Sequence, residues 1–372
     1  MAKVRNSYVV NYDKRDYVEN TNDDLLPTID LIMPAYNEED AIREKIRNIA
    51  LIDYPSDKLN VFLICDGCTD ETASLARETL CEPLCEQLKF EVIENKINQG
   101  KVGVINQAVE FCRSDIVALS DVSALISVDA LLIAAAHFKT QKNGVVSGTY
   151  TFLNPASAGE EAYWKYQTSI KLQESIMGST LGVHGAFYLF RRHLFVPLEN
   201  NIINDDFVLP MLIVESGYKA VYEPRINAIE LEQASSHVNG SRRERIAAGN
   251  VQQLFLLWRL IKPKYRGVAF NFISGKALRI SMPFCLVFFL LGSIYLSFQY
   301  PLFIVISLVQ LIVYGIALYR QTHLSTNPNK IVQTIHYLVS GYYSSMIGVI
   351  NYLANGQQLA WKRANIVEEN RK

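Results

Sequence analysis

Two patterns of hydrophobic and polar residues divide the chain near residue 279. Before this point, short apolar runs alternate with stretches in which apolar residues recur at helical spacing. After it, no Asp, Glu, Lys or Arg occurs between Ile280 and Tyr319. A single helix of that length would reach about 60 Å, twice the roughly 30 Å hydrocarbon core of a bilayer. The interruption at Gln299-Tyr300-Pro301 therefore predicts a membrane hairpin with helices at 280–298 and 301–319. The alternative, a buried hairpin of a soluble protein, would need a polar stripe that these helices lack.

A third uncharged stretch runs from Ile331 to Trp361 and is less apolar. Gln333, His336 and Asn351 interrupt it, and it is rich in tyrosine and glycine. Small residues suit helix packing in lipid, and tyrosine suits the membrane interface. We expect a third spanning helix at 332–354, with an interfacial helix as the alternative.

The distribution of charge follows the same division. Residues 279–372 carry a formal charge of +5 and the remainder carries −6, which leaves −1 for the whole chain. Arg279, Arg320 and Lys330 flank one side of the hairpin, so the positive-inside rule places that side in the cytoplasm. Residues 1–28 contain no apolar core of a signal peptide. We therefore expect a multi-pass protein of the plasma membrane with its large N-terminal part in the cytosol, and the topology of the C-terminus stays open.

The overall composition excludes several classes of protein. The 372 residues have a mean hydropathy of +0.08 and 20% charged residues, unlike a disordered or collagen-like chain. The near-zero net charge gives no basic field, so no nucleic-acid partner is expected. The patterns predict an N-terminal extension (1–28), a cytosolic domain (29–240), an interfacial amphipathic region (241–278), a transmembrane region (279–356) and a C-terminal tail (357–372).

The cytosolic domain alternates predicted strands and helices. Such alternation favours an α/β fold with a parallel, doubly wound sheet. Ligands of these sheets bind beyond the carboxyl ends of the strands. The strands are expected at 29–33, 60–65, 90–93 and 116–120, and the helices at 38–52, 72–88 and 102–112.

Polar residues that follow these strands are the candidates for ligand binding. Tyr36 and Glu38 come after the first strand, and Asp66 stands at the tip of the second, where a carboxylate can accept hydrogen bonds from a ribose or a nucleobase. Lys101 precedes a helix and offers a point charge for phosphate, although a plain turn with a solvated lysine is the alternative. Asp121 follows the last strand and can hold a hard divalent cation against a diphosphate, or else cap the next segment.

Two further clusters lie beyond the alternating region. Asp205 and Asp206 precede a helical run at 208–216, so one of them could act as a general base, although acids are also common at helix N-termini. Arg242 and Arg245 would share one face of a helix and suit a diphosphate leaving group. The alternative for this pair is a basic stop beside an anionic membrane surface.

These motifs, in this order, resemble those of family 2 glycosyltransferases, over about residues 29–262. The first part of the resemblance lies in Pro34-Ala35-Tyr36-Asn37-Glu38, Asp66-Gly67-Cys68-Thr69-Asp70, Asn98-Gln99-Gly100-Lys101, Asn106-x-Ala108 and Asp121. The second part lies in Val183-His184-Gly185-Ala186-Phe187 with Arg191-Arg192, in Asp205-Asp206-Phe207, and in Arg242-x-x-Arg245-Ile246, which is similar to a motif of membrane polysaccharide synthases.

The resemblance implies a GT-A fold for 29–240 and an inverting transfer from a nucleotide-diphospho-sugar, with a UDP-sugar expected. The implied acceptor is lipid-linked or a polysaccharide, in cell-surface glycan synthesis, and membrane lipids and synthase or export proteins are the implied partners. By position, Asp206 with Asp205 would be catalytic and Asp121 would carry Mg²⁺ or Mn²⁺. Nucleotide binding is implied for Pro34, Ala35, Tyr36, Glu38, Asp66, Lys101 and Asp121, and diphosphate or acceptor binding for Arg242, Arg245, His184 and Gly185.

Two departures from the family pattern affect what the resemblance implies. Ser123 replaces the second carboxylate of the Asp-x-Asp motif, which weakens metal ligation at that position. Ile246 replaces a Trp that helps to place the acceptor in processive members. These departures motivate a second hypothesis, a non-catalytic nucleotide-binding subunit of a polysaccharide synthase complex. A sugar nucleotidyltransferase is disfavoured because 34–38 lacks the glycine-rich basic loop that such enzymes use.

Overall fold

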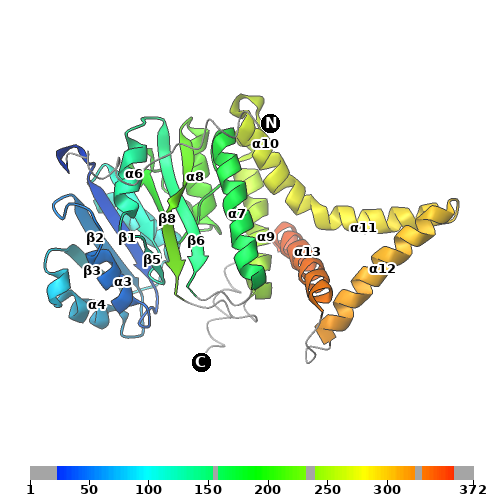
Figure 1. Ribbon diagram of the computed structural model, residues 1–372, viewed down its shortest axis with the longest axis horizontal. Coiled ribbons are helices and arrows are strands. Elements are labelled where there is room, and N and C mark those ends of the chain that lie inside the picture. The colour runs from blue at the N-terminus through cyan, green and yellow to red at the C-terminus, as the bar shows by residue number, and fades with distance from the viewer. Residues whose placement is uncertain (1–22, 154–157, 232–238, 323–328, 356–372) are drawn as a thin grey trace. The chain divides into compact units, whose positions relative to one another are not determined.

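The computed structural model describes residues 23–153, 158–231, 239–322 and 329–355 (Figure 1). Contacts divide the chain into two compact units. Among the described residues, the first comprises those of 23–200 and 205–231, and the second comprises 201–204 and those of 239–355.

An eight-stranded sheet forms the centre of the first unit, in the order β3-β2-β1-β4-β7-β6-β8-β5. The strands β1 to β4 pair in parallel, which confirms the order of elements expected for that part of the chain. However, β7 is antiparallel to both β4 and β6, and β5 is antiparallel to β8, so the sheet is mixed. The strands are β1 (Ile29–Ala35), β2 (Leu59–Asp66), β3 (Lys89–Asn95), β4 (Ile116–Ser120), β5 (Ala124–Ile126), β6 (Asn143–Phe152), β7 (Phe187–Arg191) and β8 (Lys219–Glu230).

Helices cover the sheet and account for its uniformly apolar central strands. β1 is buried along almost its whole length, as is typical of a parallel strand packed on both faces. Leu31 and Met33 belong to the same core cluster as Ile42 and Ile46, and α5 packs against β1 and β2. The helices of this unit are α3 (Ile42–Ala50), α4 (Thr72–Leu80), α5 (Gly100–Phe111), α6 (Ala130–Phe138), α7 (Ala158–Met177) and α8 (Asp205–Glu215).

One predicted helix is wrong in its extent. The periodic stretch 72–88 was expected as a single helix, but α4 ends at Leu80 and a separate 3₁₀ turn spans Pro83–Cys85. Pro83 cannot donate a backbone hydrogen bond and its ring clashes with the preceding turn, so the helix ends before it.

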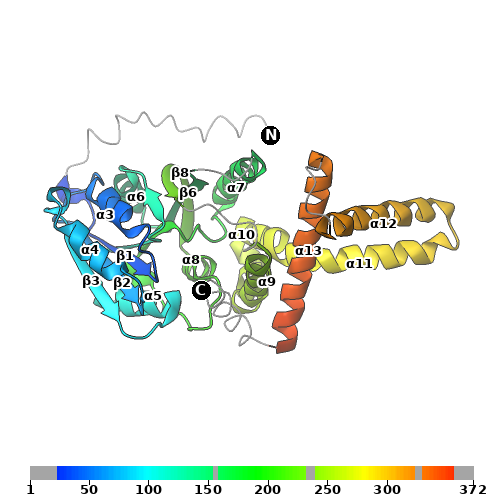
Figure 2. The same cartoon turned by 90° about the horizontal axis from the view of Figure 1, so that it is seen from below.

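The second unit consists of helices. It contains α9 (Asn239–Leu256), two short 3₁₀ turns (Trp258–Ile261 and Pro263–Tyr265), α10 (Gly267–Phe272), a π-helical turn (Ile273–Ala277), α11 (Leu278–Ser297), α12 (Pro301–Thr322) and α13 (Lys330–Asn355). Gly267–Ser297 and Pro301–Arg320 are long and apolar enough to cross a membrane. They form the expected hairpin, in which α11 and α12 pack together and the Gln310 side-chain amide donates to the Leu286 carbonyl at 2.9 Å (Figure 2).

The third uncharged stretch forms α13, which packs along α9 and also contacts α11 and α12. A Cβ at Gly348 would lie 2.4 Å from the carbonyl oxygen of Glu244, so glycine permits the close approach of α13 to α9. Among the described residues, α13 is not one of the helices apolar enough to qualify as a span. Whether 332–354 crosses the membrane stays a prediction.

A short segment ahead of α8 belongs to this second unit. The Gln252 side chain of α9 accepts a hydrogen bond from the Ile203 N–H at 2.9 Å and donates one to the Asn201 carbonyl at 2.9 Å. A Cβ at Gly249 would collide with the Asn204 side chain, which lies 2.2 Å away. Residues Asn201–Asn204, which lead directly into the Asp205-Asp206 motif, are therefore fastened to α9.

Candidate functional site

The candidate site lies at the carboxyl ends of β1, β2 and β4. These strands are parallel neighbours, so the residues that follow Ala35, Asp66 and Ser120 emerge at one edge of the sheet. This is the edge at which open α/β sheets bind their ligands.

The first two loops at this edge are bonded to each other. Asn37, which has a left-handed backbone with φ of 54°, accepts the Thr69 N–H at 2.9 Å through its side-chain oxygen. The Glu38 N–H donates to the Thr72 hydroxyl at 2.8 Å, and the Cys68 thiol lies 3.5 Å from the Ala35 carbonyl. Within this bonded frame, Tyr36 stays 36% exposed and Pro34 is partly buried at the end of β1.

Asp66 lies at the end of β2, and its carboxylate accepts hydrogen bonds from groups of the same chain. It is 3% exposed and accepts the backbone N–H groups of Gln99 (2.9 and 3.0 Å) and Gly100 (2.8 Å). The Asn95 side-chain amide donates to it at 3.3 Å. A carboxylate at this place stabilises the positive end of the α5 dipole. The structure thus gives Asp66 a role in fixing the start of α5, and its contact with a nucleoside stays a prediction.

Lys101, in the first turn of α5, forms an ion pair with Asp121. Its Nζ lies 2.6 Å from Asp121 Oδ1, and each side chain is 35% exposed. Burial by itself lowers the pKa of Lys101, but the charges of Asp121 and Asp205 raise it more, with Asp206 adding to them, and the net shift is upward. Lys101 therefore stays protonated, and its charge interacts with the carboxylates of Asp121, Asp205 and Asp206.

Asp205 and Asp206 are the first two residues of α8, and Asp205 is nearly buried. Asp205 is 9% exposed, and its Oδ2 has no hydrogen-bond partner among the described residues. The buried hydroxyl of Tyr188, on β7, also lacks one in the described part of the chain. Burial, followed by the charges of Asp205 and Asp206, raises the pKa of Tyr188, so its hydroxyl stays protonated near these carboxylates.

The 180–187 loop lies against Asp206. The Val183 N–H donates to the Asp206 carbonyl at 2.9 Å. A Cβ at Gly185 would lie 3.4 Å from Asp206 Oδ2, which places this backbone beside the carboxylate. Gly182 has φ of +66°, and a Cβ there would lie 2.4 Å from the Phe207 ring. The predicted acceptor loop and the predicted base are therefore together, as the sequence expectation requires.

His184 in this loop is enclosed by aromatic rings. It stacks on Tyr150 with ring centroids 5.8 Å apart and meets Tyr222 edge-on at 6.2 Å. Burial, and then the charge of Lys171, lower the pKa of His184 to about 3. The imidazole is consequently neutral at physiological pH.

The sequence interpretation missed two lysines at this site. Lys171, on α7, donates to the carbonyl of Leu181 and lies 3.4 Å from that of Gly182, so it holds the 180–187 loop. Lys45, on α3, is completely buried beneath the Asp121 turn, and burial, opposed by the charges of Asp121 and Glu230, lowers its pKa to about 7. The signal for Lys45 was a lysine on the apolar face of a helix that Ile42, Ile46 and Ile49 otherwise form.

The predicted arginine pair lies in the second unit. Arg242 and Arg245 both belong to α9, which confirms that they are on one helix. The Arg245 side chain is exposed, and the side chain of Arg242 lies outside the described residues.

The residues of the Asp121 turn have the donor chemistry that a hard divalent cation needs. Asp121 is partly exposed and offers one carboxylate. The described residues contain no cluster of three or more His, Cys, Asp or Glu side chains around one point. A site of this kind fits Mg²⁺ or Mn²⁺ that takes most of its ligands from a diphosphate and water.

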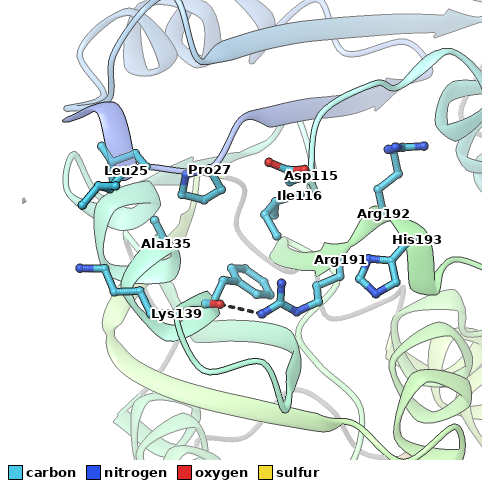
Figure 3. A pocket seen from close by; sticks show the side chains of 11 residues that line it. Leu25, Pro27, Asp115, Ile116, Ala135, Lys139, Arg191, Arg192 and His193 are labelled. Carbon is cyan, nitrogen blue, oxygen red and sulfur yellow. Dashed lines mark hydrogen bonds between the residues drawn. The ribbon is translucent and has the colours of Figure 1, made fainter. Parts of the chain in front are cut away.

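A cavity of about 520 Å³ lies elsewhere in the first unit (Figure 3). Pro27, which precedes β1, and Asp115, which precedes β4, line it together with Arg191 and Arg192 at the end of β7. These residues are at the amino ends of β1 and β4, so the cavity is at the opposite edge of the sheet from the candidate site. In Figure 3 the Arg191 guanidinium turns toward the Phe138 carbonyl, to which it donates at 2.6 Å.

Comparison with known proteins finds a family model that matches part of the first unit. The model of the family described as "Glycosyl transferase family 2" matches residues 30–196. A beta-monoglucosyldiacylglycerol synthase of Nostoc sp. is 28% identical over 139 residues, which are 37% of this chain and 28% of the relative. A Bacillus subtilis protein named "Probable glycosyltransferase YdaM" is 22% identical over 241 residues, 60% of this chain and 56% of that one. The chain thus spans 28% and 56% of the lengths of these two relatives.

A solved structure extends the likeness to most of the chain. The mannosyltransferase PcManGT from Pyrobaculum calidifontis, in complex with GDP-Man and Mn²⁺, has a TM-score of 0.69 at 22% identity. The match covers 89% of this chain and 88% of that one. It confirms the GT-A fold and the succession of an α/β unit and C-terminal helices.

Proposed function

We propose that the protein is a membrane-bound inverting glycosyltransferase, on the premise that its residues 30–196 match the model of glycosyl transferase family 2. It transfers a sugar from a nucleotide-diphospho-sugar, with a UDP-sugar as the expected donor, to a lipid-linked or polysaccharide acceptor. The observation that carries the proposal is the placement of Lys101, Asp121, Asp205 and Asp206. Their charges interact at one edge of the sheet, beside the loop that contains Gly185.

Asp206 is the proposed general base. Gly185 lies beside its carboxylate without a side chain of its own, which leaves space for a sugar hydroxyl at that position. Asp206 accepts the proton of this hydroxyl while the hydroxyl oxygen attacks the anomeric carbon. The bond from the anomeric carbon to the diphosphate oxygen breaks on the opposite face, so the configuration at that carbon inverts.

Asp205 differs from Asp206 in its surroundings and has a different proposed role. Its Oδ2 is buried and has no hydrogen-bond partner among the described residues, and its charge acts on Lys101, so its proposed role is to hold that cation in place by electrostatic attraction.

Cations of the chain neutralise the departing nucleoside diphosphate. Lys101 is one such cation, and Arg242 and Arg245, three residues apart on α9, keep their predicted role in binding a diphosphate. Mg²⁺ or Mn²⁺ on Asp121 would act as a Lewis acid toward the same diphosphate when bound. The nucleoside itself is held by the frame of Pro34, Ala35, Tyr36 and Glu38, with Asp66 fixing the start of α5.

The hairpin of α11 and α12 anchors the enzyme in the plasma membrane, with the catalytic unit on the cytosolic side. Two helices long and apolar enough to span support this, as do the three cations Arg279, Arg320 and Lys330 on one side of the hairpin. An enzyme held there meets acceptors that are themselves lipids or are carried on lipids. The glycolipid synthase among the relatives favours this class of acceptor.

The function is tested with the purified full chain in lipid nanodiscs. It is incubated with a panel of UDP- and GDP-sugars and diacylglycerol or polyprenyl-phosphate acceptors, with MnCl₂, with MgCl₂ and with EDTA. We expect a glycolipid product whose anomeric configuration by NMR is the inverse of the donor's. Nucleotide binding without transfer to any acceptor would favour the non-catalytic subunit instead.

A further inference from the structure

Lys45 lies in the core of the first unit, although lysine is almost never fully buried. It is 0% exposed, and it occupies the apolar face of α3 with Ile42, Ile46 and Ile49. Among the residues that the structure describes, it forms no ion pair with a carboxylate within 4.0 Å. A buried ammonium without an ion-pair partner costs stability. The packing of the fold therefore does not explain why a lysine occupies this position.

The hydrogen bonds of Lys45 point to another reason. Its Nζ donates to the Ser120 hydroxyl at 2.6 Å and also to the Ala124 carbonyl. Ser120 ends β4 and Ala124 begins β5, so these acceptors are the two ends of the turn that carries Asp121. The Lys45 ammonium group thus bonds to both ends of the turn, on the side of the turn that faces the core.

The outer side of the turn is fastened by other elements. The Asp121 N–H donates to the Ala186 carbonyl at 3.0 Å, and the Ser123 carbonyl accepts the Leu231 N–H at 3.1 Å. These bonds fix the middle of the turn, whereas Lys45 fixes its ends. Asp121 itself projects toward Lys101, 2.6 Å away, where the donor's diphosphate is proposed to bind.

We propose that Lys45 is a positioning residue, whose ammonium clamps the Ser120–Ala124 turn so that Asp121 is held in place for the donor diphosphate. The inference rests on the proposed function. It requires that Lys45 contributes to the geometry of the site and not to the stability of the fold. A well-packed apolar side chain of similar length at this position would give an equal or larger free energy of unfolding.

Replacing Lys45 by an apolar residue should therefore leave the stability of the protein nearly unchanged but weaken its binding of nucleotide. In Lys45→Met, the unfolding midpoint of the full chain in nanodiscs should fall by no more than about 3 °C, or rise. Binding of UDP or GDP in MnCl₂, measured by isothermal titration calorimetry with whichever nucleotide the wild type binds, should weaken about tenfold, because misplacing a positioned group is costly. Donor KM should rise in proportion, with a smaller change in kcat.

A second variant keeps the test valid if Lys45→Met fails to fold. Ser120→Ala removes one of the two acceptors of the ammonium, together with the bond from the Ser120 hydroxyl to the Ala186 carbonyl at 3.2 Å, so it should weaken nucleotide binding about threefold. The loss of binding in the double variant should be smaller than the product of the two single losses, since both changes break the bond between Lys45 and Ser120.

The outcomes separate this inference from the proposed function. If the wild-type chain binds no nucleoside diphosphate, the proposed function fails. If the wild type binds and both single variants bind equally well, Lys45 is not a positioning residue. A large loss of thermal stability in Lys45→Met, with unchanged binding in Ser120→Ala, would likewise overturn the inference.

Discussion

Lys101 Nζ lies 2.6 Å from Asp121 Oδ1, and this ion pair joins the start of α5 to the end of β4 at the edge of the sheet where the ligand is expected. The two residues belong to different sequence motifs, but their side chains form one ion pair in the structure. Both side chains stay partly exposed, so a bound diphosphate can reach the lysine.

Replacement of Lys101 should weaken donor binding more than it affects folding. In Lys101→Met we expect the affinity for the nucleoside diphosphate to fall by about tenfold or more, because a charge-assisted bond to phosphate is lost. Calorimetric titration measures this directly. Lys89, on the edge strand β3, provides a matched control, and Lys89→Met should bind like the wild type.

Asp66 should be mainly important for stability. In Asp66→Asn, the amide nitrogen replaces one acceptor that faces backbone N–H groups, which leaves buried donors unsatisfied. We expect a loss of about 2 kcal/mol in the free energy of unfolding. Denaturant unfolding of the full chain checks this. An equally stable variant that no longer binds nucleotide would instead assign Asp66 to the nucleoside.

Gly182 and Gly185, in the loop that lies against Asp206, should behave differently when replaced by alanine. At Gly182 the new methyl group would lie 2.4 Å from Phe207 on a left-handed backbone, so Gly182→Ala should unfold at a clearly lower temperature. At Gly185 it would only touch Asp206, at 3.4 Å. Gly185→Ala should therefore keep its unfolding temperature but lose most of kcat, because the methyl group fills the acceptor's place.

His184 should make the protein less stable in acid. Its pKa of about 3 lies below the value of about 6.5 expected in the unfolded chain, so the unfolded state binds more protons between these values. Stability contributed by the neutral ring is present above pH about 6.5 and declines as the pH falls toward 3. The acid-induced loss should be smaller in His184→Gln. Identical pH dependence of the unfolding free energy in both proteins would contradict the assignment.

The orientation of the hairpin is open to chemical labelling. A cysteine in place of Tyr300, in the turn between α11 and α12, should react with a membrane-impermeant maleimide in intact cells. Cys81, which is exposed in the first unit, should react only after permeabilisation. The reverse pattern would place the catalytic unit outside the cytosol.

The elements that the sequence predicted best are those with strong local patterns. The strand at 116–120 and the hairpin at 280–298 and 301–319 follow from uninterrupted apolar runs, and the structure places β4, α11 and α12 there within a few residues. The antiparallel strand β7 could not be predicted in this way, because its pairing with β4 and β6 depends on chain segments far from it in sequence.

Some residues of the candidate site could likewise be predicted from the sequence, and others could not. Residues at strand ends, such as Asp66 and Asp121, could be identified because topology fixes where strand ends meet. Lys45 and Tyr188 could not, since each reaches the site from an element whose own pattern indicates only a core position. Likewise, that the chain's own donors fill the Asp66 carboxylate became clear only from the three-dimensional arrangement.

The assignment of Asp206 as the base is tested most directly by Asp206→Asn in the full chain in nanodiscs. Its matched control is Glu91→Gln, the same chemical change on the exposed edge strand β3. We expect Asp206→Asn to bind the nucleotide within about twofold of the wild type while transfer falls by at least about a thousandfold, as loss of a positioned base requires. Glu91→Gln should retain wild-type transfer. Wild-type turnover by Asp206→Asn would contradict the proposed mechanism.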